Sequence, residues 1–199
     1  MWIIKIVLAF LIGSFPTGYM VGKVLKRTDV RREGSGNIGA TNVWRVVGKI
    51  PGIFVLFVDI FKGYLVVKYI SPWEPISFLS PFEESLVLGF LVILGHTFSI
   101  FLKFRGGKGV ATATGVLFAL EPKICALCFF IWTVIFLSFR YVSLASILTV
   151  VFLPLILLVL LRPFSYILFA TLLALLISYK HLPNIRRLIL QQEPKFHFR

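Results

Sequence analysis

The chain has 199 residues, of which 58% are hydrophobic and only 15% are charged. An ordinary water-soluble domain is about 45–50% apolar and about 25% charged, so this composition excludes such a domain and indicates that lipid is the solvent for much of the surface. The formal net charge of +13 would indicate nucleic-acid binding in a soluble protein. In a membrane protein it instead indicates cytoplasmic loops rich in Lys and Arg, with anionic lipids or substrates as partners, and we expect no nucleic acid.

The apolar stretches are long enough to predict several membrane-spanning helices. A spanning helix needs about 20 mainly apolar residues, and candidates lie at 2–22, 50–70, 85–103, 141–161 and 164–180. The stretch 109–139 is long for one span and short for two. Glu121-Pro122 stands near its middle, where proline favours the start of a new helix.

The distribution of charge decides how this stretch is counted. Basic residues cluster at 23–49, 103–108, 140 and 180–199, whereas 71–84 holds three glutamates and no Lys or Arg. Two short crossing helices, 109–120 and 122–139, place every basic cluster on one side. The prediction is therefore an all-α, polytopic integral membrane protein of about seven transmembrane helices, N-terminus outside and C-terminus cytoplasmic, with one domain over 1–199. A re-entrant 109–120 is the weaker alternative.

The first polar segment combines a glycine turn with a helical pattern. Gly34–Gly36 permit a turn in which backbone N–H groups converge on an anion. From Asn37 onward the pattern indicates a helix, with Asn37, Thr41 and Arg45 on one face. A helix that starts at this turn would present its N-terminal N–H groups together with Ser35, Asn37 and Arg45 to an anion. A capped amphipathic helix resting on the membrane is an equally open interpretation.

The second segment follows a span that contains His96. It carries three cations and three glycines in seven residues, namely Lys103, Arg105, Gly106, Gly107, Lys108 and Gly109. It is not a Walker A loop, because Gly109 stands where Ser or Thr should follow Lys108. A glycine-rich turn that leads into a helix N-terminus nevertheless favours a phosphate site over a flexible basic loop. An ionisable residue such as His96 near the end of a span indicates function.

Three further features have either a structural interpretation or two interpretations that stay open. The basic segment 180–188 on its own favours a juxtamembrane anchor. Asp59 and Lys62 lie three residues apart inside a span, where a structural ion pair and support of a site are both open. Cys125 and Cys128 form a CxxC without basic or polar surroundings, so we interpret them as buried small residues rather than a redox pair.

Together the segments resemble the bacterial membrane glycerol-3-phosphate acyltransferases that use acyl phosphate as donor. The similarity is carried by 35–42 with Arg45, by 96–98 and 103–112, and by 181–188. Their order and spacing match over nearly the whole chain. One departure is Gln191-Gln192 before Glu193, where the family often has a glycine, so Glu193 is expected to be structural.

The resemblance implies transfer of a fatty acyl group from acyl phosphate to the 1-hydroxyl of sn-glycerol 3-phosphate. The products are lysophosphatidate and inorganic phosphate, in the first step of phospholipid synthesis at the bacterial inner membrane, with the active site facing the cytoplasm and no cofactor or metal. The expected catalytic residues are Ser35, Arg45, His96, His181 and Asn184. The expected substrate-binding residues are Gly36, Asn37, Thr41, Asn42, Lys103, Arg105, Gly106, Gly107, Lys108 and Gly109.

The sequence leaves the base and two other function classes open. Neither His96 nor His181 is followed by Asp in the His-x4-Asp arrangement of other glycerolipid acyltransferases. The base is then His96, His181 or a substrate phosphate, and a covalent acyl-Ser35 lacks an evident activating partner. A carrier of phosphorylated metabolites is disfavoured because no inverted repeat is visible. A non-catalytic lipid-binding scaffold is the third class.

Overall fold

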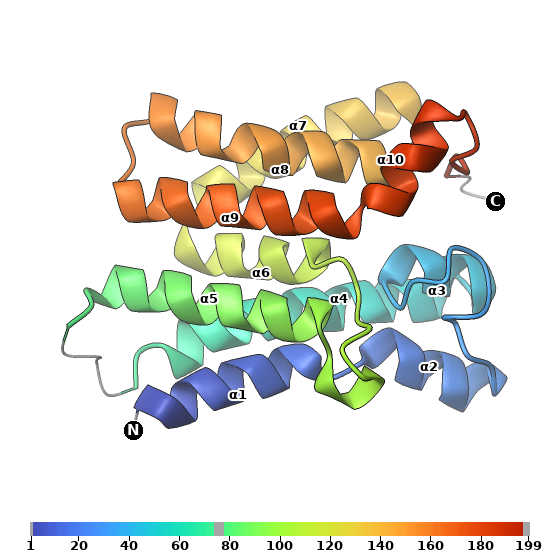
Figure 1. Ribbon diagram of the computed structural model, residues 1–199, viewed down its shortest axis with the longest axis horizontal. Helices are drawn as coiled ribbons and strands as arrows, with labels where there is room; N and C mark the ends of the chain where they lie inside the picture. Colours follow the sequence, from blue (N-terminus) through green and yellow to red (C-terminus); the bar gives the residue numbers. More distant parts are fainter. Residues whose placement is uncertain (1, 74–77, 197–199) are drawn as a thin grey trace. The chain divides into compact units, whose positions relative to one another are not determined.

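The computed structural model describes residues 2–73 and 78–196, and all regular structure in these two ranges is helical (Figure 1). This confirms the all-α prediction. Contacts divide the chain into two compact units, Met1–Leu120 (unit 1) and Glu121–Arg199 (unit 2). That the chain forms one domain over 1–199 stays a prediction.

Unit 1 is a bundle of helices joined by two polar segments. Its elements are α1 (Trp2–Ser14), α2 (Thr17–Lys26), α3 (Ala40–Val46), α4 (Lys49–Leu65) with a π-helical turn (Val66–Ile70), α5 (Pro81–Thr97), a 3-10 turn (Ile100–Leu102) and α6 (Val110–Leu120). Helix α1 packs along α5, and α4 packs against both α3 and α6. A capping box at Ser80, whose hydroxyl accepts from the N–H of Glu83, fixes the start of α5.

The first predicted span is not one helix. The span predicted over 2–22 is found as a candidate span over Trp2–Lys26, but Pro16, which has no N–H to donate, separates it into α1 and α2. The break frees backbone carbonyls, and buried side chains bind them. Lys62 Nζ donates to the Phe15 carbonyl at 2.7 Å, and the Ser99 hydroxyl donates to the Ser14 carbonyl. Non-helical backbone at membrane depth requires such partners.

Helices α4 and α6 approach each other at their backbones. A Cβ atom added at Gly115 would lie 1.8 Å from the Ile60 carbonyl oxygen, and one added at Gly63 would lie 2.1 Å from that of Thr112. Small residues at these positions allow the contact, as in many membrane helix pairs. Eleven residues of α6 extend about 16 Å, roughly half of the hydrocarbon thickness.

Unit 2 consists of α7 (Pro122–Phe139), α8 (Val142–Val159), α9 (Phe164–Lys180) and α10 (Leu182–Ile189). The predicted break at Glu121-Pro122 is confirmed, since Pro122 is the first residue of α7. Helix α8 packs against both α7 and α9. Helix α10 is bent by 62° from α9.

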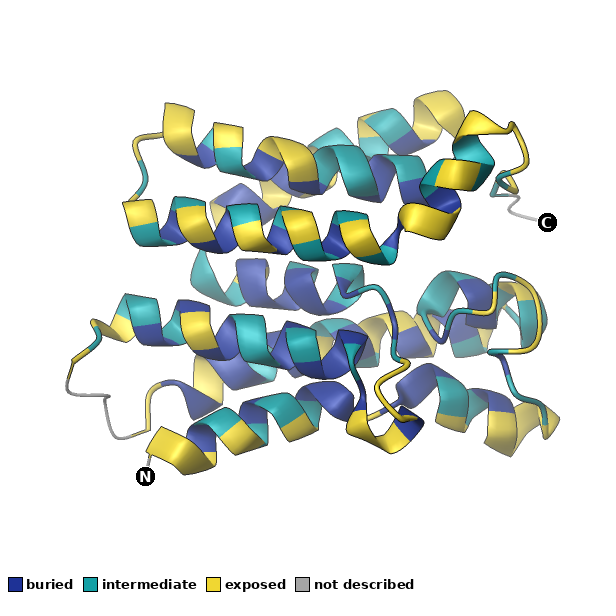
Figure 2. Cartoon of the chain, in the orientation of Figure 1, coloured by how far each residue is buried: buried dark blue, intermediate teal, exposed yellow. Residues whose placement is uncertain are grey.

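In the described ranges, five helical stretches are long and apolar enough to cross a membrane, and a sixth is obtained if the bent pair α9–α10 is one span. Figure 2 shows exposed residues along the helices. Many of them are large and apolar, and Phe57, Phe130 and Leu175 are each more than 60% exposed. Such faces are expected for helices in lipid. Seven crossings would require the short α6 to cross the membrane as well. The number of crossings and the orientation of the termini therefore stay predictions.

Candidate functional site

The first polar segment is folded around one buried side chain, Asn42, which is only 2% exposed. Its Oδ1 accepts the N–H of Ser35 at 2.8 Å. Its Nδ2 lies 2.8–3.1 Å from the carbonyl oxygens of Val30, Glu33 and Asn37. Asn42 therefore holds the Gly-Ser-Gly turn in place from the first turn of α3, and its polar atoms are engaged within the loop.

The turn itself is as predicted, but the helix that follows starts later than expected. Gly34 and Gly36 have φ of +59° and +72°, which favour glycine. The Asn37 side chain accepts the N–H of Gly39 at 2.8 Å, and this local bond keeps the chain non-helical until Ala40. The expectation that Asn37 begins the helix and shares a face with Thr41 and Arg45 is therefore wrong.

This shift changes what the segment can offer an anion. The N-cap of α3 is Gly39, so the Gly-Ser-Gly turn is not the N-terminus of the helix. The N–H groups of Ser35 and Gly36 are bound to Asn42 and to the Glu33 carbonyl within the loop. Among the side chains of this segment, that of Ser35 is half-buried and that of Arg45 is exposed.

The start of the same loop is held by an ion pair. Arg31 donates through Nε and Nη2 to Asp29, at 2.9 and 2.7 Å, and its guanidinium lies 4.8 Å from the centre of the Tyr19 ring. The hydrogen bonds from Arg31 lower the pKa of the Asp29 carboxyl to about 2. Arg31 is thus bound to its own loop and serves its shape.

The second segment folds back onto the end of α5. The N–H groups of Gly106 and Gly107 donate to the carbonyls of Thr97 and His96, at 3.2 and 2.9 Å. Gly109, with φ of +87°, leads directly into α6, which confirms the predicted glycine-rich turn before a helix. Of its cations, Lys103 and Arg105 are exposed and Lys108 is half-buried.

His96 lies beneath this glycine-rich loop and is 4% exposed. A Cβ atom added at Gly107 would lie 2.1 Å from His96 Nε2, so the imidazole edge packs directly on the glycine backbone. On the other side of the ring, Nδ1 lies 3.8 Å from Asp59 Oδ1. Asp59 also contacts Lys62 Nζ at 2.6 Å.

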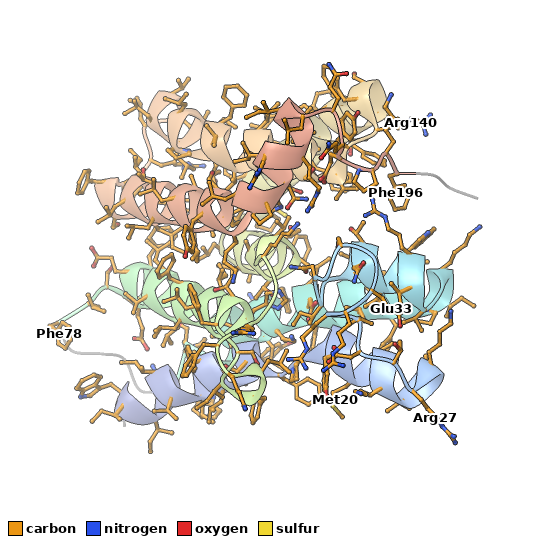
Figure 3. All side chains as sticks on the ribbon, turned by 45° about the vertical axis from the view of Figure 1, so that its right-hand side comes forward. Met20, Arg27, Glu33, Phe78, Arg140 and Phe196 are labelled. Carbon is orange, nitrogen blue, oxygen red and sulfur yellow. The ribbon has the colours of Figure 1, made fainter. Side chains whose placement is uncertain are left out.

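The two segments share one hydrophobic core although they lie about sixty residues apart in the chain. Leu102, at the start of the second segment, belongs to the same buried cluster as Val30 and Ile38 of the first loop and Val43 of α3. The structure thus anchors the bases of both segments on common packing. In Figure 3, Arg27 and Glu33 lie at one end of unit 1 and Phe78 at the opposite end.

Unit 2 contains the other two predicted site residues, both buried. His181 Nδ1 lies 2.8 Å from the Ile177 carbonyl oxygen, and Asn184 Nδ2 donates to Glu193 Oε1 at 2.7 Å. Glu193 also accepts from Ser143 and from Arg187 Nε, at 2.7 Å each. These bonds join the tail to α8 and α10.

The sequence left open whether Asp59 and Lys62 form a structural ion pair or support a site, and it gave no role to Thr17. The available signal was an ionisable pair inside a span, which usually faces the bundle interior. Asp59 in α4 lies close to His96 in α5, 37 positions later in the sequence. No local sequence pattern encodes that contact.

The fold and these segments define a class: a helical membrane protein with two polar segments, one basic and rich in glycine, built on a shared core. The comparisons with known proteins then identify the family. Residues 3–191 match the family model described as glycerol-3-phosphate acyltransferase. The chain belongs to the glycerol-3-phosphate acyltransferase family.

Relatives and solved structures resemble the chain over almost its whole length. It is 43% identical to glycerol-3-phosphate acyltransferase 2 of Moorella thermoacetica, covering 98% of this chain and 97% of that one. It is 45% identical to the enzyme of Carboxydothermus hydrogenoformans, covering 94% and 93%. The glycerol 3-phosphate form of PlsY, an integral membrane glycerol 3-phosphate acyltransferase, superposes with a TM-score of 0.90 at 39% identity, covering 98% of this chain and 96% of that one. A lysophosphatidic acid form of PlsY gives 0.86 at 37% identity, covering 98% and 95%.

Proposed function

We propose that this chain transfers a fatty acyl group from acyl phosphate to the 1-hydroxyl of sn-glycerol 3-phosphate. The products are lysophosphatidate and inorganic phosphate. Family membership supports the acyltransferase activity and the acceptor, and related structures described as glycerol 3-phosphate and lysophosphatidic acid forms agree with this acceptor and product. We place the reaction at the cytoplasmic face of the bacterial inner membrane, because the basic segments gather there under the positive-inside rule.

The observation that carries the choice of donor is the absence of a His-x4-Asp pair at His96 and at His181. An acyl phosphate is a mixed anhydride whose phosphate leaves readily, so the enzyme can rely on positioning and charge stabilisation. The transition state is then stabilised mainly by cations that bind the departing phosphate and by hydrogen-bond donors directed at the oxyanion. The exposed Arg45 and the basic second segment suit these tasks.

We assign roles to the residues according to what the structure lets each contact. Ser35 and Arg45 act on the reacting groups, because Ser35 is half-buried and Arg45 is exposed, whereas the backbone N–H groups of the turn are bound within the loop. His96 takes the proton of the acceptor hydroxyl. The loop of Lys103, Arg105, Gly106, Gly107, Lys108 and Gly109 holds a substrate phosphate. Gly36 and Asn37 shape the turn that Asn42 fixes. The roles of Thr41, His181 and Asn184 in the reaction are proposed from the family resemblance.

The donor is tested with purified protein in detergent. Glycerol 3-phosphate is supplied with acyl phosphate, acyl-CoA or acyl carrier protein of the same chain length, and lysophosphatidate and phosphate are measured together. We expect turnover with acyl phosphate alone, one phosphate per lysophosphatidate, and loss of turnover in Arg45→Ala. Robust turnover with acyl-CoA or acyl carrier protein in the absence of acyl phosphate would overturn the donor, and tight substrate binding without any product would favour a carrier.

A further inference from the structure

Helix α2 has one face that packs inside unit 1. Thr17, Gly18 and Gly22 are buried there. A Cβ atom added at Gly18 would lie 1.8 Å from the Ile38 carbonyl oxygen, and one added at Gly22 would lie 2.6 Å from Val30 Cγ1. Contacts as close as these leave no room for another molecule between α2 and the first polar loop. A ligand of α2 must therefore bind to the opposite face of the helix.

The opposite face of α2 is exposed, and it combines apolar and basic side chains. Met20, Lys23 and Val24 are spaced by three and four residues along the helix, so they share this face. Val24 is 71% exposed and Met20 is 43% exposed, and Lys23 and Arg27 are exposed as well. In Figure 3, Met20 lies at the surface of α2 and Arg27 extends outward from the end of the helix.

The charges of the surrounding residues leave this face positive. Residues 17–33 include five basic and only two acidic residues, and the acidic Asp29 is already paired with Arg31. Lys26 is bound to the end of α3, because its Nζ donates to the carbonyl of the last residue of that helix at 2.6 Å. The other two cations of α2 and its C-cap lie on the exposed face, where they attract an anion.

The length of the first span places this face at the boundary of the hydrocarbon. Trp2–Lys26 is a candidate span of 25 residues, and as a helix these extend up to about 37 Å, against about 30 Å of hydrocarbon. The surplus lies among the headgroups, where a cation avoids the cost of burial in hydrocarbon. Tyr19, whose ring centre lies 5.8 Å from Lys23 Nζ, is typical of this boundary. The apolar residues of the face can then contact acyl chains while its cations reach lipid phosphates.

We propose that the exposed face of α2, formed by Met20, Lys23, Val24 and Arg27, is a binding site for an anionic phospholipid. Lys23 and Arg27 bind the phosphate of the lipid, and its acyl chains pack on Met20 and Val24. A zwitterionic lipid carries a cation of its own beside the phosphate, so it is held more weakly. None of the four residues belongs to the groups to which we assign the reaction, so the site can be tested without turnover.

Lipid binding is measured by native mass spectrometry on the full-length protein in detergent, with dioleoyl phosphatidylglycerol as the probe and dioleoyl phosphatidylcholine as the comparison. We expect Lys23→Gln and Arg27→Gln each to weaken phosphatidylglycerol binding by about fivefold, and together by about 25-fold, as for two independent cations near a lipid surface. Phosphatidylcholine should bind more weakly and be nearly unaffected. Equal affinity of the wild type for both lipids, or no loss in the double variant, would overturn the proposal.

Two exposed lysines on other elements provide a matched control for net charge. Lys68→Gln combined with Lys123→Gln removes the same charge and should leave the affinity for phosphatidylglycerol unchanged. If this control weakens binding as strongly as the α2 double variant, the lipid is attracted by the net charge and not by this face. Glycerol 3-phosphate in excess should not displace the lipid. Displacement would assign the two cations to the substrate site instead.

The contact with lipid is tested separately in nanodiscs that contain phosphatidylglycerol. A nitroxide is attached to a single cysteine at position 24, in a background with Cys125 and Cys128 replaced by alanine, and a label at position 32 serves as the comparison. We expect oxygen, which concentrates among the acyl chains, to relax the label at 24, and a water-soluble nickel chelate to relax the label at 32. Relaxation at 24 by the nickel chelate, or by neither reagent, would show that water or protein covers this face and would overturn the proposal.

Discussion

At the scale of single residues, Ser35 and Arg45 are held in place by different parts of the chain. The backbone N–H of Ser35 is bound by Asn42, so the turn does not need the serine hydroxyl. Arg45 is exposed on α3, where its side chain extends from a helix packed against α4. Truncation of the Ser35 side chain should therefore leave the turn intact.

We expect Ser35→Ala and Arg45→Ala each to lower kcat by roughly 10²-fold or more, the scale for losing one oriented donor. Arg45→Lys should recover only part of the loss, because an ammonium cannot make a two-pronged phosphate contact. Steady-state kinetics with both substrates varied, on variants with unchanged thermal unfolding, measure this. A change confined to KM for glycerol 3-phosphate would assign Arg45 to binding alone.

Gly107 belongs to the proposed phosphate-binding loop and packs on His96, so its substitution should affect both substrate binding and the chemical step. An added methyl would lie 2.1 Å from His96 Nε2, so the imidazole must move. We expect Gly107→Ala to raise KM for glycerol 3-phosphate and also to lower kcat. Lys103→Met removes an exposed cation of the same loop and should raise only KM. If Gly107→Ala changes only KM, the position of His96 does not limit the rate.

At the scale of elements, Glu193 joins the tail to α8 and α10. Burial raises the pKa of Glu193, but hydrogen bonds from Ser143, Asn184 and Arg187 outweigh it and keep the pKa below its ordinary value. Because this pKa is lowered in the folded protein, ionised Glu193 contributes to folding stability. The contribution is complete above the ordinary carboxyl pKa of roughly 4.3 and is lost as the pH falls through the pKa of Glu193 in the folded protein.

Glu193→Gln should therefore destabilise the protein by about 1–3 kcal/mol at pH 7, since a charged acceptor is lost. Thermal unfolding in detergent should show a Tm lower by about 5 °C. The difference from wild type should shrink as the pH is lowered below about 4, where Glu193 itself becomes protonated. The neighbouring exposed Gln192→Ala is the control and should match wild type. A difference that persists unchanged at low pH would show that the charge of Glu193 is unimportant.

Several elements were predictable because one local rule dominates each. Pro122 starts α7 as expected, and Gly109 leads into α6. The same rule was overlooked at Pro16, whose apolar neighbours suggested one unbroken span. The late start of α3 was not predictable from spacing, because a side-chain bond from Asn37 competes with the helix.

Within the site, the residue types were predictable, but not all their tasks. Asn42 has its polar atoms bound to the loop around it, and its predicted role at the substrate stays a prediction. The approach of Asp59 to His96 depends on how α4 and α5 pack, which residue spacing within one helix cannot encode. The roles of Ser35 and Arg45 at the substrate stay predictions.

At the scale of the whole molecule, the membrane topology can be tested directly. In unit 1 the basic end that carries Arg27 and Glu33 lies opposite the end that carries Phe78 (Figure 3). The positive-inside rule then places Phe78 outside. Seven crossings, with α6 included, also place Leu161 outside and Gln192 inside.

Single cysteines at 32, 78, 161 and 192, in a background with Cys125 and Cys128 replaced by alanine, check this. An impermeant thiol reagent added to intact cells should label 78 and 161 only, and all four should react after the membrane is permeabilised. If α6 does not cross, 192 becomes accessible from outside and 161 does not. That pattern would refute the seven-span topology.

The two buried ion pairs of unit 1 have different consequences for how the chain enters the membrane during synthesis. Asp59 and Lys62 are three residues apart in α4, so they can neutralise each other while that helix alone is inserted. Each ion unpaired at the centre of an inserting helix would cost about 2.5–3.5 kcal/mol. Lys5 and Glu84 lie on α1 and α5, and can pair only once both helices are in place. Until α5 arrives, α1 must keep Lys5 near its N-terminal end, where its long side chain can reach water. Insertion of α1 should thus depend on a helix made some eighty residues later, whereas insertion of α4 should not.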